Sequence, residues 1–202
     1  IITPAEVSIT AAGNIYGNNV STITDLRSVS GLTLSAGSNK DIGKSGGQNL
    51  KVNAVTINNI SGNHPNICIT NSGAGNLTIG AMTNTSATNI DFNKTLTLVT
   101  LTVSGGALTI GATYAPSTLN VNDAIGVTSQ NVAITATTIT FGTSGTITTT
   151  TSGNISLTAE GLSSALKAIT SAGNLSFSKI TTSATYTLGA AISCTGTLTV
   201  NS

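Results

Sequence analysis

The chain has 202 residues, a length that fits one ordinary domain. Charged residues make up only 6% of it, against about 25% in a typical soluble domain. The net charge of +1 excludes the basic surface that nucleic acid or anionic lipid would require. No apolar run is long enough to span a membrane, so no membrane insertion is expected, and no signal-peptide pattern opens the chain.

The composition predicts a folded chain despite its polarity. Hydrophobic residues make up 39% of the sequence, and only three prolines occur. Disordered chains are usually richer in charge and proline and too poor in apolar residues to offset the entropy of ordering. We therefore expect a packed core built mainly from Ile, Leu, Val and Ala.

Short triplets of the form apolar–small polar–apolar recur along the whole chain. Such alternation places one set of side chains inward and the other outward on a β-strand, and Val, Ile and Thr favour strands. The chain is therefore predicted to be all-β. In order, the triplets are residues 32–34, 50–52, 55–57, 67–69, 77–79, 96–98, 101–103, 108–110, 119–121, 132–134, 139–141, 155–157, 175–177 and 198–200.

One segment, residues 160–169, has apolar residues near helical spacing. These are Leu162, Leu166 and Ile169. Gly161 and the two serines that follow Leu162 disfavour a helix there. We keep a short helix as a minor alternative and expect β-structure elsewhere.

A degenerate repeat underlies the strands. The phrase Gly-Asn-apolar-Ser-apolar occupies 153–157 and again 173–177, and a related phrase lies at 196–200. Near the start, Ile15, Leu32 and Leu50 follow one another at similar but slightly shorter intervals. Repeats of this length are typical of solenoids. We predict one parallel β-helix (β-solenoid) domain over 1–202, with irregular coils of about 17–23 residues, most regular over 130–202. An antiparallel β-sandwich is the alternative.

The Gly-Asn-apolar-Ser/Thr-apolar phrase, which recurs at the predicted coil length, resembles the repeat of filamentous-haemagglutinin-type bacterial surface exoproteins. The resemblance covers residues 152–200 best, 131–141 fairly and 1–60 poorly. It implies a right-handed parallel β-helix that is exported and adhesive, located outside the cell or on its surface. The chain departs from the family in being short, with irregular coil lengths, and is either a segment of a longer protein or an unrelated solenoid.

The residues that carry chemistry are few and scattered. The single histidine, His64, is expected to be a solvated turn residue. With no second histidine, a His-rich zinc site is excluded. Among the acidic residues, only the pairs Asp25/Asp41 and Asp91/Asp123 come near the spacing of stacked coil positions. We predict no catalytic, cofactor-binding or metal-binding residues and no enzymatic activity. The acidic residues are Glu6, Asp25, Asp41, Asp91, Asp123 and Glu160.

Two cysteines, Cys68 and Cys194, are separated by more than half of the chain. In a solenoid this separation is about six coils, or about 29 Å, whereas a disulfide requires Cα atoms within about 7 Å. No disulfide is therefore expected. The alternation places Cys68 outward and Cys194 inward.

Pairs of threonines two positions apart suggest outward Thr ladders, which in some β-solenoids order water. The pairs are not evenly spaced by one coil length, which weighs against an ice-binding face. They are Thr95/Thr97, Thr100/Thr102, Thr138/Thr140, Thr146/Thr148/Thr150, Thr185/Thr187 and Thr197/Thr199.

Together these features predict a non-catalytic extracellular structural protein. We expect a rod-like adhesin shaft or a filament subunit that stacks end to end with itself. Host or surface glycans are further expected partners, and no nucleic acid is expected to bind. A carbohydrate- or ice-binding solenoid is the alternative, followed by a polysaccharide-degrading β-helix enzyme, which would need clustered carboxylates.

Overall fold

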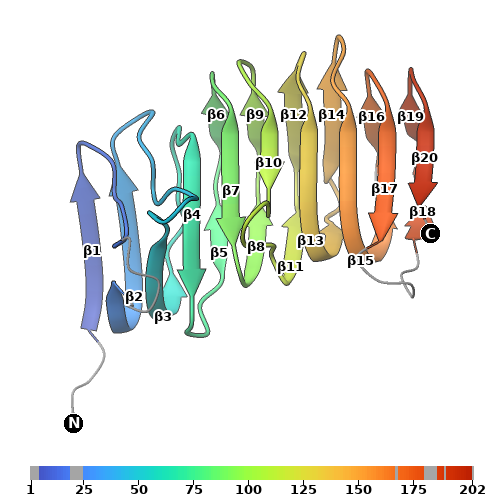
Figure 1. Ribbon diagram of the computed structural model, residues 1–202. Coiled ribbons are helices and arrows are strands. Elements are labelled where there is room, and N and C mark those ends of the chain that lie inside the picture. The colour runs from blue at the N-terminus through green and yellow to red at the C-terminus, as the bar shows by residue number, and fades with distance from the viewer. Residues whose placement is uncertain (1–4, 19–24, 167, 180–185, 189, 202) are drawn as a thin grey trace.

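The computed structural model describes residues 5–18, 25–166, 168–179, 186–188 and 190–201. These residues form twenty strands and no helix. Figure 1 shows the strands side by side along a rod, from β1 at one end to β19 and β20 at the other. The pairings between the described strands are parallel, so the predicted β-solenoid is confirmed and the antiparallel sandwich is wrong.

The strands follow one another closely, with short turns between most of them. They are β1 (Ala5–Ala11), β2 (Leu26–Ala36), β3 (Leu50–Ile57), β4 (Asn66–Asn71), β5 (Leu77–Ile79), β6 (Met82–Asn84), β7 (Thr88–Phe92), β8 (Thr95–Leu98), β9 (Leu101–Val103), β10 (Leu108–Ile110), β11 (Thr118–Val121), β12 (Ala124–Thr128), β13 (Val132–Phe141), β14 (Thr146–Thr150), β15 (Ile155–Leu166), β16 (Ile169–Ser171), β17 (Leu175–Lys179), β18 (Tyr186–Leu188), β19 (Ile192–Cys194) and β20 (Leu198–Asn201).

From β4 onward each coil contributes to three stacks of parallel strands. The first stack contains β4, β7, β10, the start of β13, the start of β15, β17 and β20. The second stack contains β5, β8, β11, the end of β13, the later part of β15 and β18. The third stack contains β6, β9, β12, β14, β16 and β19. The solenoid makes about seven turns.

Apolar residues of successive coils lie directly above one another in the core. In one inward column of the first stack, the sequence interval is shorter from Ile90 to Ile110 than from Ile110 to Ile134. The coil length therefore varies while the register is kept. The whole column is Ile67, Ile90, Ile110, Ile134, Leu157, Phe177 and Val200.

The first coils are longer than the sequence spacing indicated. Ile15 pairs with Ile42, and Ile42 pairs with Ile67. The equivalence of Ile15, Leu32 and Leu50 is therefore wrong. Residues 43–49 explain part of the difference. Ile42 is level with Ile67, and Leu50 is level with Ile69, so seven residues in one coil correspond to a single residue in the next. The loop at 43–49 is therefore an insertion without a counterpart in the next coil.

The segment considered as a minor helix, residues 160–169, is extended through β15 and the start of β16 apart from residue 167, which lies outside the described residues. Strand β15 pairs with β13 on one side and with β17 and β18 on the other. Backbone pairing with both neighbouring coils outweighs the local spacing of the leucines.

Candidate functional site

The acidic residues do not gather into a site. Asp41 takes the place in its coil that Asn14 and Asn66 take in the adjacent coils, and Asp91 is level with Cys68. Asp123 lies beside the third stack, where its carboxylate accepts the Thr100 hydroxyl at 3.1 Å. The spacing of the pairs Asp25/Asp41 and Asp91/Asp123 therefore does not correspond to stacking. Glu6 and Glu160 lie on β1 and β15.

Asp25 joins two segments of the backbone near the start of the rod. Its carboxylate accepts the backbone N–H of Asn18 and the backbone N–H of Lys51, each at 2.8 Å. Both carboxylate oxygens are thus bonded to the protein's own backbone. This arrangement fixes a loop and is unlike the arrangement of a general base that faces a substrate.

Asp41 belongs to a ladder of polar side chains that precedes the first stack. Its backbone N–H donates to Asn14 Oδ1 at 2.8 Å, and its carboxylate accepts from Asn66 Nδ2 at 2.8 Å. Asn89 Nδ2 continues the ladder to Asn66 Oδ1 at 3.1 Å. The Tyr16 hydroxyl also donates to Asp41, at 2.9 Å, and the pKa of Tyr16 is raised by this hydrogen bond.

Asp91 and Cys68 form a buried pair beneath a loop. Asp91 accepts the backbone N–H groups of Thr113 and Tyr114 at 3.0 and 3.2 Å, and its other oxygen lies 3.9 Å from Cys68 Sγ. Burial, followed by the nearby Asp91 charge, raises the pKa of Cys68 to about 12. The thiol therefore stays protonated at neutral pH and is a poor nucleophile.

Both cysteines are free, and they lie in different stacks, which agrees with the expectation of no disulfide. Cys68 alternates with core residues Ile67 and Ile69 and faces Asp91, which agrees with an outward position. It is nevertheless buried. Cys194 packs against the edge of the core and is partly exposed.

His64 is buried, with 2% of its surface exposed, so its expected solvation is wrong. Its Nδ1 lies 2.8 Å from the carbonyl oxygen of Lys40, and its Nε2 lies 3.2 Å from that of Ser61. The His64 carbonyl in turn accepts from Asn84 Nδ2 at 2.9 Å. His64 therefore links three consecutive coils, a role that depends on neighbours that the local sequence does not reveal.

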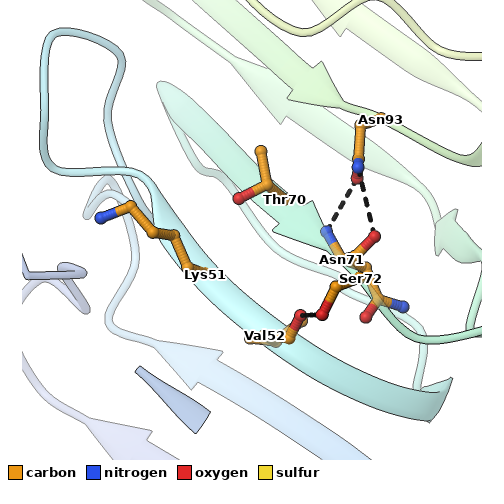
Figure 2. A pocket seen from close by; sticks show the side chains of 6 residues that line it. All are labelled: Lys51, Val52, Thr70, Asn71, Ser72 and Asn93. Carbon is orange, nitrogen blue, oxygen red and sulfur yellow. Dashed lines mark hydrogen bonds between the residues drawn. The ribbon is translucent and has the colours of Figure 1, made fainter. Parts of the chain in front are cut away.

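One shallow pocket of about 190 Å³ opens at the end of β4. Figure 2 shows Lys51 on one side of it and Asn93 on the other. Asn93 accepts the backbone N–H of Asn71 at 2.7 Å and donates to its carbonyl at 3.2 Å, and Ser72 Oγ donates to the carbonyl of Val52. Lys51 Nζ donates to the backbone of the adjacent loop at 2.6 Å. The polar groups of the pocket thus join coils to one another, and its lining includes no carboxylate.

Across the described residues, no three side chains of the His, Cys, Asp or Glu type come together in a way that could hold a metal ion. This same part of the chain also lacks any helix of the length and apolarity needed to cross a membrane.

The Gly-Asn phrase has a structural role that sequence analysis did not identify. Asn131 Oδ1 accepts the backbone N–H of Asn154 at 3.0 Å, Asn154 Oδ1 accepts that of Asn174 at 2.7 Å, and Asn174 Oδ1 accepts that of Thr197 at 2.8 Å. We call these three asparagines, Asn131, Asn154 and Asn174, the corner ladder. Glycine precedes Asn154 because a Cβ at Gly153 would overlap the carbonyl oxygen of Gln130.

These features define the class of the protein as a parallel β-solenoid repeat protein whose polar residues connect successive coils. Comparison with protein-family models, with curated proteins and with solved structures finds no match for the chain.

Proposed function

We propose that the chain is a non-catalytic structural module, a rod-like shaft of an adhesin or surface filament that lies outside the cell. The observation that supports this most strongly is the use of the polar side chains. Asp25, Asp41, His64 and the corner ladder all bind backbone or side chains of neighbouring coils. The resemblance to filamentous-haemagglutinin-type exoproteins supports the extracellular location and adhesion to host or surface glycans.

The end of the rod at β20 supports association through further coils. Leu198 and Val200 continue the inward columns of Leu175 and Phe177, yet they are 52% and 57% exposed. Leu175 and Phe177 are buried, because β20 covers them. An uncovered apolar column and an unpaired strand edge both favour a further strand. We infer that a further coil covers β20, from a second copy stacked head to tail or from the same solenoid in a longer chain.

Concentration-dependent assembly of the purified chain tests self-stacking. We expect sedimentation velocity to show growing species and electron microscopy to show filaments of uniform width. Val200→Asp, which places a charge in the inward column, should abolish assembly. Thr199→Asp is the matched control, because Thr199 lies on the same strand in the outward column and should leave assembly intact. A chain that stays monomeric at high concentration would contradict self-stacking.

A further inference from the structure

The third stack presents a second kind of surface, one that the proposed shaft function does not use. Its six strands pair in the order β19-β16-β14-β12-β9-β6 and lie side by side along the rod (Figure 1). Their inward residues, from Met82 to Ile169, are buried in the core. Their outward residues face away from it and form one continuous sheet surface, which we call the third-stack face.

The central outward column of this face consists almost entirely of hydroxyl residues. Threonine occupies four of its six positions and serine one, and these side chains are exposed or partly exposed. The sequence interval between neighbours varies along the column and is shortest at its start. The column is Thr83, Thr102, Gly126, Thr148, Thr170 and Ser193.

The uneven spacing of threonines in the sequence therefore does not prevent a regular array. Loops of different length absorb the variation between coils, and backbone pairing brings the hydroxyl residues into register. Parallel columns on either side add Ala124 level with Thr146, and Thr128 level with Thr150. Thr-x-Thr units on β14 thus lie within a two-dimensional array.

The dimensions of the array follow from strand geometry. Neighbours in a column are about 4.8 Å apart, and outward residues along one parallel strand are about 6.6 Å apart. Strands β12 and β14 are two such steps wide, whereas β6, β9, β16 and β19 have three residues and one outward position each. The face therefore covers at most roughly 300–400 Å². A stable protein interface buries about 800 Å² on each partner, so this face alone is too small for a second copy of the chain.

The side chains of the face further limit the kinds of partner that it can bind. Within its described strands the outward positions carry Thr, Ser, Ala and Gly, with no charged or aromatic side chain. The nearest charge among the described residues is Asp123, which directly precedes β12 and accepts the Thr100 hydroxyl at the edge of the face. Protein interfaces depend on aromatic and Arg anchors, and small-molecule sites are lined mainly by hydrophobic and aromatic side chains. An uncharged array of alternating hydroxyl and methyl groups instead suits a partner that is itself a repeating lattice of hydrogen-bonding groups.

We propose that the third-stack face binds ice. The spacing within a column, about 4.8 Å, lies close to one repeat on the prism plane of hexagonal ice. The threonine hydroxyls hydrogen-bond to lattice waters, and the threonine γ-methyl groups hold the waters between them in ordered positions. The absence of charge on these described strands matters because a strongly hydrated side chain would impose a different arrangement on the water.

Gly126 allows a test by gain of activity. It is the one position in the central column without a side chain, and a Cβ there would have no heavy atom within 4 Å. Gly126→Thr should complete the column and raise the thermal hysteresis and the inhibition of ice recrystallisation above those of the unmodified chain. A purely structural role for the column gives no reason for this increase.

Loss of activity is tested at Thr148, at the centre of the face. Thr148→Lys should remove thermal hysteresis, and Thr102→Lys, at a more exposed position, should do the same. Thr158→Lys is the matched control, because Thr158 is an outward threonine on the first stack, level with Thr135 and Ser178, and should leave hysteresis unchanged. Circular dichroism and urea unfolding establish that each variant is folded.

Several outcomes would overturn the proposal. The proposal is wrong if the unmodified chain shows neither thermal hysteresis nor faceting of ice crystals. It is also wrong if Thr158→Lys lowers the hysteresis as much as Thr148→Lys, or if a folded Gly126→Thr shows no increase in hysteresis. Retention on microcrystalline cellulose without ice activity would assign the face to a polysaccharide instead. Filament formation is measured separately with Val200→Asp, so failure of one proposal leaves the other intact.

Discussion

The backbone N–H of Asn174 donates to the side-chain oxygen of Asn154, which belongs to the preceding coil, at 2.7 Å. The same bond recurs between Asn131 and Asn154 and between Asn174 and Thr197. The corner ladder thus uses a side chain to satisfy a backbone donor at the turns before β15, β17 and β20. Backbone donors left without partners at such a turn would be costly.

Asn154→Ala should lower the free energy of unfolding by about 1 kcal/mol, because the N–H of Asn174 loses its acceptor. The measurement is the shift in the midpoint of urea unfolding. Asn76→Ala provides the control, since Asn76 occupies the same place in a Gly-Asn-Leu phrase but lies exposed before the second stack, outside the corner ladder. Equal effects of the two changes would argue against a specific role for the ladder.

Gly153→Ala should destabilise the fold by about 1–3 kcal/mol, because the new methyl group would overlap the Gln130 carbonyl and force the turn to move. Gly126→Ala is the matched change in open space, and it should stabilise β12 slightly because glycine is unfavourable within a strand. Thermal unfolding of both variants tests the contrast. If Gly153→Ala and Gly126→Ala changed the unfolding temperature equally, the close approach of consecutive coils at residue 153 would be refuted.

The strands could be predicted because alternation of apolar and polar residues is a local signal. Leu96-Thr97-Leu98 and Ile155-Ser156-Leu157 lie in strands, and the first and third residues of each triplet are buried. Coil register is not local. The glycine-rich loop at 43–49 lengthens its coil. Its composition indicates a loop but not the coil register, and so the pairing of Ile42 with Ile67 could not be counted from spacing.

Burial of individual polar residues was also beyond local reasoning. The sequence around His64 and Pro65 is typical of a surface turn, yet the His64 ring is buried. The ring packs against the preceding coil, where its Nδ1 meets the carbonyl of Lys40, and this neighbour is not visible in the local sequence. The alignment of Thr102, Gly126 and Thr148 depends in the same way on register between coils. Periodicity shows which side chains face outward, whereas pairing decides which of them meet.

The two cysteines should differ in reactivity towards a thiol reagent at pH 8. Cys68 is buried and its pKa is raised to about 12, so almost none of it is thiolate. Cys194 is partly exposed at the edge of the core and should react in the native protein. We expect one thiol to be labelled in buffer and two in urea, with native labelling lost in Cys194→Ser. Labelling of Cys68 in the native protein would contradict its burial against Asp91.

Stability should fall at alkaline pH because of Cys68. The pKa of its thiol is 9.0 when the thiol is fully solvated, as in the unfolded chain, and about 12 in the folded protein. Above pH 9 the unfolded chain therefore releases a proton that the folded chain retains, which favours unfolding. The stabilisation is complete below pH 9 and declines as the pH rises towards 12, with a loss of about 1.4 kcal/mol by pH 10.

The effect is measured as a difference between two proteins, so that every other ionisable group contributes equally to both. Cys68→Ala removes the titrating thiol, and its urea unfolding midpoint should fall less steeply between pH 8 and 10 than that of the unmodified chain. Cys194→Ala is the control for the loss of a thiol and should retain the steep decline, because it leaves Cys68 beside Asp91 in place. Parallel pH profiles for the unmodified chain and Cys68→Ala would show that the thiol ionises equally in both states, and would refute the desolvation of Cys68 beside Asp91.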